Sequence, residues 1–369
     1  MKVGILTHYD VNNMGAQLQM YALYNVLKGL GHDPYILTYY KNFDFALDEK
    51  LKNQVSIKSV PYYIKNYVIA KGLRLSFFNA RKYLANKMFR EKQFRFQHYA
   101  TADIDCAIVG SDEVFSIPVG VNIMMYGHAL PTRNVFSYAP SFGQTDMKLL
   151  RKHGCIELIA SGLLKFKAIS ARDVHTFNMV KELTGIEPRI VCDPVVLSDF
   201  YGCSNADVKL PKHRYLLVYS YDRSMVEPSE VKAITAFAKS NNLITVSVGT
   251  YHKWCDMNIV CNCLEWVEYF KGAEAVITDT FHGAIVSIMT NKPMAIAVRS
   301  LNVNKLTDLI KRTSLVHRRI NEITYSEINR VFETDIDFSQ VNQCVAELRK
   351  TGLKFLCDAL DLCMEGNNE

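Results

Sequence analysis

AEAVITDTFHGAIVSIMTNKP, residues 273–293, decides the fold of this chain. Within it, Ala275–Thr278 is a short apolar run rich in β-branched residues, which predicts a buried strand. From Phe281 onward the apolar residues recur at helical spacing, until Asn291 and Pro293 end the predicted helix. The stretch therefore predicts a strand, a turn and a helix, which is the repeating unit of parallel α/β proteins.

The turn between this strand and helix carries polar residues. Asp279 and Thr280 interrupt the apolar run, and His282 and Gly283 follow at the helix start. Backbone N–H groups at a helix start lack intrahelical partners and carry a partial positive charge, so they bind anions. An imidazole beside a residue without a side chain lets a ligand approach both the backbone and a proton donor. The alternative is an ordinary α/β turn whose histidine only caps or packs.

The same order of strand and helix recurs along the chain. Short apolar runs alternate with helical patterns, which predicts parallel strands and Rossmann-like domains. A polar stretch broken by Gly202 and Pro211 separates two such series and predicts an interdomain linker. We therefore predict an α/β protein with a Rossmann-like domain at 1–197, a linker at 198–214, a second Rossmann-like domain at 215–325, and C-terminal helices at 326–369 that pack back on the first domain.

The composition of the 369-residue chain is globular, with 49% hydrophobic and 22% charged residues. No run approaches the roughly 18–20 apolar residues that span a bilayer, and the first strand follows Met1 without a signal-peptide pattern. The 10 cysteines are scattered through apolar contexts, which is typical of buried free thiols in a reducing compartment. We therefore expect a cytoplasmic protein.

One group of residues could in principle hold zinc, namely His252, Cys255, Cys261 and Cys263. It lacks the paired CxxC spacing of a strong zinc site, so we expect no metal. The first strand is not followed by GxGxxG, so a dinucleotide is not indicated either. The sequence thus predicts a protein without a cofactor.

Residues 50–98 (Lys50 to His98) differ in character from the rest of the chain. They contain about a dozen Lys and Arg residues against a single acid, Glu91, and they interleave many Tyr and Phe residues. Such an insertion suits the anionic inner face of a membrane or a lipid-linked phosphate. The alternative, given equal weight, is a solvated helical insertion whose aromatic residues pack on the domain. Nucleic acid is not expected, because no nucleic-acid motif accompanies the charge.

Six stretches, in order over about residues 1–310, resemble the polysaccharide pyruvyl transferase family. Each stretch alone would be weak, but six in the family's order are fairly specific. They are NNMGAQLQMYAL (12–23), GSDEVF (110–115), YAPSFG (138–143), SARD (170–173), CDPV (192–195) and TDTFHGAIVSIMTNKP (278–293).

The resemblance implies a GT-B-like pair of Rossmann-type domains that face each other across a cleft. It also implies that a pyruvyl group moves from phosphoenolpyruvate to sugar hydroxyls, with no metal required. His282 matches the family's histidine of the HG turn, and Arg172 matches the arginine of its SxRE/D stretch. The chain has Phe281 where some members place arginine, and Asn304-Lys305 where Asn-x-Arg is more usual. Arg299 and Lys305 are therefore alternative partners for the donor's anionic end.

Phosphoenolpyruvate presents a phosphate and a carboxylate close together, and arginine suits planar recognition of either group. Donor binding is accordingly assigned to Arg172, to Arg299 or Lys305, and to the helix start at Phe281 and Gly283. Protonation of the donor's methylene carbon needs a positioned acid, for which we nominate His282. The attacking hydroxyl needs a base, for which the candidates are Asp112, Glu113 and Asp279. Asp279 could instead only cap the helix, and Asp112 could only hydrogen-bond a sugar.

The acceptor sugar is expected on the first domain, because ligands of open α/β sheets collect at the loops that follow the strands. The residues assigned to it are Asn12, Gly15, Gln17 and Glu113. The predicted function is pyruvyl transfer, with closure of a cyclic ketal, in capsular or other surface polysaccharide assembly on a polyprenyl-diphosphate-linked acceptor. Two alternatives stay open: a nucleotide-sugar-dependent glycosyltransferase of the same architecture, and a non-catalytic scaffold at the membrane.

Overall fold

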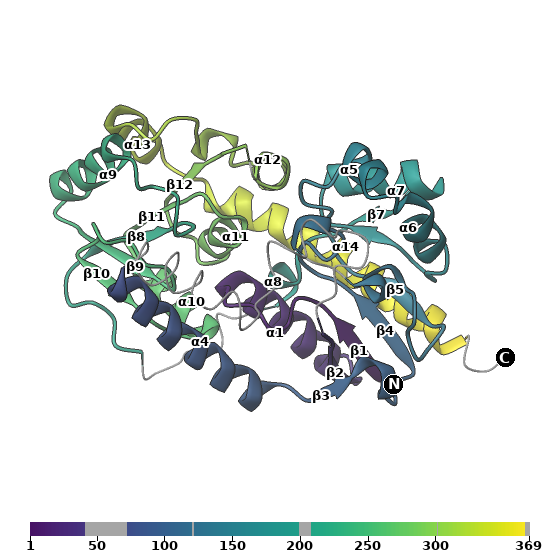
Figure 1. Cartoon of the computed structure of the whole chain (residues 1–369). Coiled ribbons are helices and arrows are strands. Elements are labelled where there is room, and N and C mark those ends of the chain that lie inside the picture. Colours follow the sequence, from purple (N-terminus) through teal and green to yellow (C-terminus); the bar gives the residue numbers. More distant parts are fainter. Residues whose placement is uncertain (41–71, 120–121, 199–207, 301, 366–369) are drawn as a thin grey trace.

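The structure is a computed structural model that describes residues 1–40, 72–119, 122–198, 208–300 and 302–365. Among these residues, one large parallel sheet lies in each half of the chain (Figure 1). The first sheet has the order β3-β2-β1-β4-β5, and a small parallel pair, β6-β7, accompanies it. These strands are β1 (Lys2–Leu6), β2 (Asp33–Thr38), β3 (Phe96–His98), β4 (Cys106–Val109), β5 (Val135–Ser137), β6 (Ser170–Ala171) and β7 (Arg189–Ile190).

The second sheet has the order β10-β9-β8-β11-β12-β13 and is parallel throughout. Its strands are β8 (Tyr215–Tyr219), β9 (Ile244–Val248), β10 (Met257–Ile259), β11 (Ala275–Thr278), β12 (Met294–Ala297) and β13 (Arg319–Ile320). In each sheet the strand order reverses beside the first strand, between β1 and β4 and between β8 and β11. Ligands of open parallel sheets bind outside the carboxyl ends of the strands at such reversal points.

Helices connect the strands of both sheets. In the first half they are α1 (Met14–Gly29), α4 (Leu73–Gln93), α5 (Met147–Lys152), α6 (Ile156–Leu163), α7 (Val174–Thr184) and α8 (Pro194–Leu197). In the second half they are α9 (Pro228–Ser240), α10 (Cys263–Gly272), α11 (Phe281–Met289), α12 (Val303–Arg312), α13 (Tyr325–Glu333) and α14 (Phe338–Glu365). The predicted fold class, two Rossmann-like α/β domains, is confirmed.

The stretch at 273–293 folds as its pattern predicts. All four residues of β11 are buried, and the strand pairs with β8 on one side and β12 on the other. Helix α11 begins at Phe281, and its first turn is capped by Thr280, whose side chain accepts a hydrogen bond from the Gly283 N–H at 3.0 Å. The turn therefore lies at the reversal point of the second sheet, where a ligand site is expected.

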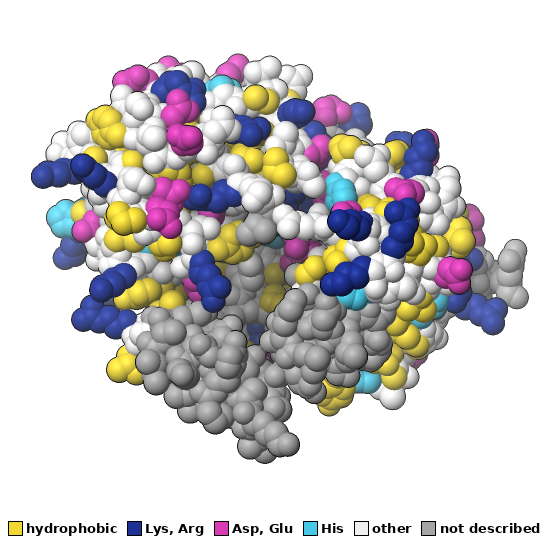
Figure 2. All heavy atoms as spheres, turned by 45° about the horizontal axis from the view of Figure 1, so that its top comes forward, with side chains coloured by type: hydrophobic (Ala, Val, Ile, Leu, Met, Phe, Trp, Pro, Cys, Tyr) yellow, Lys and Arg dark blue, Asp and Glu magenta, His cyan; other side chains and the backbone are white. Residues whose placement is uncertain are grey.

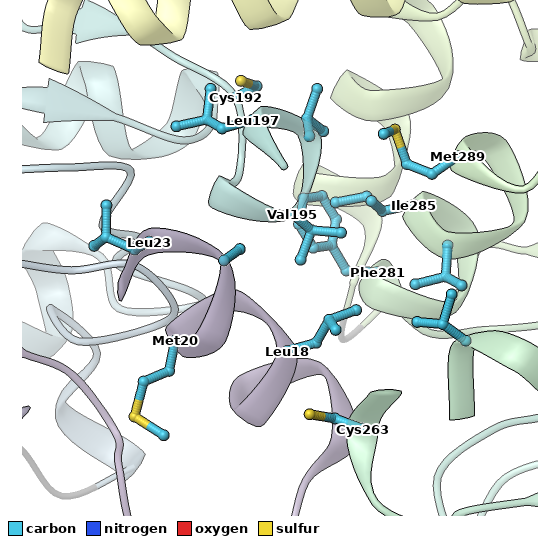
Figure 3. Packing of buried hydrophobic residues seen from close by; sticks show 14 of the residues in the cluster. Leu18, Met20, Leu23, Cys192, Val195, Leu197, Cys263, Phe281, Ile285 and Met289 are labelled. Carbon is cyan, nitrogen blue, oxygen red and sulfur yellow. The ribbon is translucent and has the colours of Figure 1, made fainter. Parts of the chain in front are cut away.

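The two domains share an apolar core (Figure 3). Leu18 and Met20 on α1 belong to the same cluster of buried residues as Val195 on α8, Cys263 on α10 and Ile285 on α11. Helix α1 contacts α10, and α8 contacts α11, so elements of the first domain pack directly on elements of the second. An interdomain interface of this apolar kind restricts the relative motion of two domains.

Helix α4 joins the two domains at a second place. Buried Lys82 donates a hydrogen bond from Nζ to the carbonyl of Gly249 in the second domain at 2.9 Å, and burial lowers the pKa of this lysine. The Phe78 ring lies 5.6 Å from the Tyr251 ring, again across the domain boundary. In Figure 1, α4 runs beside both sheets. Part of the basic stretch therefore holds the domains together.

Two further parts of the predicted insertion belong to the first domain. Arg90 is buried, and its NH2 pairs with Asp10 Oδ1 at 2.8 Å, so this cation forms an ion pair within the first domain. Phe96–His98 forms β3, which pairs with β2 at the edge of the first sheet and is not helical. Residues 50–71 of the predicted insertion, and most of the predicted linker, lie outside the described residues.

The C-terminal helices divide between the domains. Helix α13 contacts α9 and β12, so the second domain continues past residue 325, where the sequence placed its end. Helix α14 lies against the first domain: Arg349 donates from Nε to the carbonyl of Val196 at 2.8 Å, and the Phe355 ring lies 6.3 Å from the Tyr138 ring. No helix among the described residues is long and apolar enough to cross a membrane.

Candidate active site

A cavity of about 250 Å³ opens where the reversal points of the two sheets meet. Its walls come from the loops after β1, β4 and β6 in the first domain and from those after β8 and β11 in the second, with α12 adding one side chain. Six residues that the sequence assigned to the site line it, namely Asp112, Glu113, Arg172, Phe281, His282 and Lys305. The sequence analysis did not assign the other lining residues to the site, and these are His8, Val11, Asn13, Ala16, Tyr219, Tyr221 and Thr280.

His282 is held between the two domains. Its Nε2 lies 3.3 Å from Asp193 Oδ2, an ion-pair contact that lacks the alignment of a hydrogen bond. On another side the ring meets α1 so closely that a Cβ on Gly15 would lie 2.2 Å from His282 Nδ1. Only 11% of the side-chain surface is exposed. The imidazole is therefore fixed in position by a carboxylate and by a glycine of the opposite domain.

Asp193 is the most important residue that the sequence analysis did not assign to the site. It caps α8 by accepting from the Val195 N–H at 3.1 Å, and its Oδ2 accepts from Arg172 NH1 at 3.2 Å. Burial would raise the pKa of this carboxyl group, but His282 and Arg172 outweigh burial and lower the pKa to about 2. A sequence signal for Asp193 was present, because the residue stands in the CDPV stretch (192–195) at the end of a predicted strand.

Arg172 supplies a buried cation at the cavity wall. Its guanidinium lies over the Phe281 ring, 4.7 Å from the centroid, and its NH1 is 3.7 Å from Asp112 Oδ1. Burial alone would lower its pKa, but the neighbouring carboxylates of Asp193 and Asp112 raise it. Its buried Nε has no hydrogen-bond partner among the described residues. Phe281 thus supports an arginine from the other domain through a cation–π contact.

Lys305 supplies the second cation, from the start of α12. Its Nζ lies 2.6 Å from Glu113 Oε1 of the first domain, and this pair spans the cavity mouth. Burial would lower the pKa of Lys305, but Glu113 outweighs that effect and raises it. The lysine is therefore charged and bound to a carboxylate that an anionic ligand could replace.

Asp112 is a second carboxylate that lines the cavity, beside Glu113. It has φ +80°, a left-handed conformation that is uncommon for residues other than glycine and often found at functional sites. Burial would raise its pKa, but Arg172, His282 and other nearby cations lower it, so the group is an ionised base at neutral pH. Its place in the cavity fits the role of base that the sequence analysis assigned to it.

Asp279 and Arg299, which the sequence assigned as base and donor ligand, do not line the cavity. Arg299 NH2 pairs with Glu230 at 2.9 Å, and its Nε lies 3.3 Å from Asp279 Oδ2. Asp279 is buried, and the side chain of Asn302 donates to its carbonyl. Arg299 and Asp279 therefore form an ion pair within the second domain, and this pair connects the loop after β12 to the turn after β11.

Four other assigned residues also have supporting roles in the structure. The amide of Asn12 donates to the Asn79 carbonyl and accepts from Asn86, both on α4. Buried Gln17 donates to two carbonyls of the loop before α1. Gly15 faces His282, and the N–H of Gly283 is taken by the helix cap. None of these four residues lines the cavity, because each is occupied in shaping the two loops around it.

The possible zinc ligands are engaged within the second domain. His252 Nε2 lies 2.9 Å from Ser220 Oγ, and Cys255, Cys261 and Cys263 are buried thiols. In the part of the chain that the structure describes, no group of His, Cys, Asp and Glu side chains is arranged to hold a metal ion.

Asp193→Asn is expected to lower the free energy of unfolding by at least about 2 kcal/mol at neutral pH, because a carboxyl pKa near 2 against about 3.9 when unfolded corresponds to that energy. A carboxyl group with a lowered pKa stabilises above the unfolded value and loses this effect as pH falls. The difference between wild type and variant should therefore narrow below about pH 4 and close only below about pH 2. Urea unfolding at a series of pH values measures this.

The control for this prediction is Asp358→Asn, which removes an exposed carboxylate paired with Lys354. An exposed pair of this kind contributes little, so the control should follow the wild type at every pH. If the free energies of unfolding of Asp193→Asn and wild type differ by a constant amount down to pH 2, the neighbours of Asp193 do not lower its pKa.

Comparisons with known proteins agree with this geometry. A family model described as polysaccharide pyruvyl transferase matches residues 13–299, and no curated protein sequence matches the chain. One similar solved structure, assigned as a UDP-N-acetylglucosamine 2-epimerase from Listeria monocytogenes, has 10% identity over 96% of this chain and 94% of that chain, with a TM-score of 0.54. A second UDP-N-acetylglucosamine 2-epimerase has 10% identity over 96% and 95%, with a TM-score of 0.53. These two share the fold. The family match over most of its length shows that this chain belongs to the polysaccharide pyruvyl transferase family.

Proposed function

We propose that the chain transfers the pyruvyl group of phosphoenolpyruvate to two hydroxyls of one sugar, forming a cyclic ketal in a surface polysaccharide. The observation that carries the proposal is the cavity between the domains, where a buried arginine, a partly buried lysine and an imidazole paired with a carboxylate meet. A small trianionic donor and a protonation step both need these groups.

The shape and charge of the cavity favour a small anionic donor. Its volume of about 250 Å³ lies below the roughly 300–1,000 Å³ of pockets for drug-sized ligands, and a nucleotide sugar is at least of that size. The starts of α1 and α11 contribute Asn13, Ala16, Phe281 and His282 to the wall, so two positive helix ends meet there. Arg172 lines this cavity, and its guanidinium can bind a carboxylate or phosphate oxygen.

The proposed chemistry begins with proton transfer from His282 to the methylene carbon of the donor. Positive charge then develops on the adjacent carbon, which a sugar hydroxyl attacks while its proton passes to Asp112. Loss of phosphate and attack by a second hydroxyl close the ketal and release a second proton. Asp193 stabilises the charged imidazole before transfer, because its carboxylate stays ionised beside the ring.

Lys305 and Glu113 form an ion pair that the donor can exchange on binding. In the structure their charges neutralise each other across the cavity mouth. We propose that a donor oxygen replaces Glu113 at Lys305, because a phosphate offers more negative charge to the same ammonium group. Glu113 is then free to bind an acceptor hydroxyl from the first-domain side. The acceptor itself is proposed to be linked to polyprenyl diphosphate at the cytoplasmic face of the membrane.

The test is phosphate release from phosphoenolpyruvate in the presence of a panel of soluble and lipid-linked sugars. Release that depends on a sugar is expected, together with a product that has gained the mass of a pyruvyl ketal. No release across the panel, with thermal stabilisation by nucleotide sugars and none by phosphoenolpyruvate, would favour a glycosyltransferase.

In the same assay Lys305→Gln should raise the KM for phosphoenolpyruvate about 10- to 100-fold, the usual effect of losing a charged hydrogen bond. Lys311→Gln, on the same helix but exposed, should leave KM unchanged.

A further inference from the structure

The outer face of α4 is an exposed row of large apolar side chains. Leu73, Phe77, Leu84 and Met88 follow one side of the helix, and they expose 76%, 65%, 56% and 70% of their surface. Single exposed apolar residues are ordinary, but a contiguous row along one helix face marks an interaction surface.

Basic residues border this row on both sides. At 100° per residue, exposed Arg74, Arg81 and Lys92 lie along one flank and exposed Lys87 along the other. Glu91, the one acid of the helix, lies in line with the row at its C-terminal end. Glu91 lies 3.8 Å from Lys87, which leaves three cations in excess. On the face shown in Figure 2, in contrast, Lys and Arg side chains are intermixed with Asp and Glu.

The opposite face of α4 carries the structural contacts, so the outer row is not needed for packing. Lys82 on the inner face bonds to the second domain, and Asn86 bonds to Asn12 in the loop before α1. That same loop supplies Val11 and Asn13 to the wall of the cavity. A surface that binds α4 from outside would therefore lie beside the entrance of the site.

We infer that the outer face of α4 docks on an anionic lipid bilayer, with its apolar row at the headgroup level and its basic border against acidic headgroups. An apolar stripe flanked by Lys and Arg has the chemistry of an interfacial helix. The basic border fits a negatively charged surface better than a second copy of this face, which would bring like charges together. The inference deepens the proposed function and rests on it, since a bilayer is where a polyprenyl-linked acceptor is presented.

The first test is co-sedimentation of the full chain with vesicles of phosphatidylglycerol and phosphatidylcholine, compared with phosphatidylcholine alone. The wild type is expected to bind the anionic vesicles, and added salt is expected to weaken binding. The triple variant Arg74→Gln, Arg81→Gln, Lys87→Gln should bind about 100-fold more weakly, since each basic residue near such a surface contributes about fivefold. Its control replaces Arg133, Lys148 and Arg151, which are exposed elsewhere on the first domain, and should bind within about twofold of wild type.

A second variant tests the apolar row. Phe77→Gln, Leu84→Gln, Met88→Gln should weaken binding at least about tenfold, because these side chains would leave the interface. Its control replaces Val174, Ile186 and Val316, exposed apolar residues that form no such row, and should retain binding. Thermal unfolding of all variants near the wild-type temperature is expected, because the replaced side chains face solvent.

Equal binding to both kinds of vesicle, no binding, or equal losses in variants and controls would overturn the inference. So would a dimer, seen by sedimentation velocity without lipid, that the apolar variant abolishes. Both α4 variants should keep wild-type phosphate release with a water-soluble acceptor, because their side chains lie outside the cavity. Absence of release from the wild type would count against the proposed function, whereas vesicle binding separately decides the docking surface.

Discussion

Replacement of His282 by glutamine is expected to lower kcat for pyruvyl transfer about 10²- to 10⁴-fold, the range that a positioned general acid contributes. Glutamine keeps a polar side chain of similar length but cannot carry a transferable proton. The Nε2 of His282 lies 3.3 Å from the carboxylate of Asp193, so the replacement also removes this contact. Initial rates of phosphate release at saturating donor and acceptor measure the effect.

The matched control is His213→Gln, which changes an exposed histidine just before β8. This residue lies at the amino ends of the parallel strands, whereas the cavity lies at their carboxyl ends. It should retain the wild-type kcat. Circular dichroism and thermal unfolding of both variants separate loss of catalysis from loss of folding. A His282→Gln enzyme that keeps more than about a tenth of the wild-type kcat would remove His282 from the role of acid.

Gly15→Ala is expected to lower kcat at least about 100-fold, although it adds only one methyl group. The new Cβ would lie 2.2 Å from His282 Nδ1 and 2.3 Å from Cγ, so the ring must move. A displacement of about 1 Å in a catalytic group can cost about 100-fold in rate. The KM for phosphoenolpyruvate should change far less than kcat, because Arg172 and Lys305 are untouched.

Gly29→Ala provides the control within the same helix. Gly29 is exposed at the end of α1, and a Cβ there would meet nothing within 4 Å. Alanine is favoured over glycine in a helix by up to about 1 kcal/mol, so this variant should be as stable as wild type or more stable, with unchanged kcat. Equal kcat values for Gly15→Ala and wild type would show that the ring can move without consequence.

Local sequence patterns were sufficient to predict the elements at the centre of the fold. The run Ala275–Thr278 forms β11, and the helix that begins at Phe281 is α11. These predictions succeeded because burial and helical periodicity are properties of neighbouring residues. The position of His282 followed from the turn alone, and the six motifs supplied the family.

Long-range partners could not be predicted in the same way. The sequence assigned Arg299 to the donor, yet its guanidinium pairs with Glu230 and Asp279 behind the turn. It treated the basic stretch as one surface, yet Lys82 is buried against the second domain. Which charge meets which carboxylate depends on how distant segments pack, and charge counting along a chain contains no such information.

Asp193 illustrates the intermediate case. Its stretch was recognised, but the role of its carboxylate depends on two residues, Arg172 and His282, that are brought to it from different parts of the chain. A residue of this kind is found from sequence only when every strand end is treated as a possible contributor to one site.

The apolar core shared by the two domains has a consequence for how such enzymes diversify. Exchange of one domain for that of a relative would replace one side of the contacts between α1 and α10 and between α8 and α11, and would leave mismatched surfaces under the cavity. The halves are therefore not interchangeable modules. New acceptor preferences are expected to arise by variation of the loops after β1 and β4, which can change while the core beneath them is inherited as a unit.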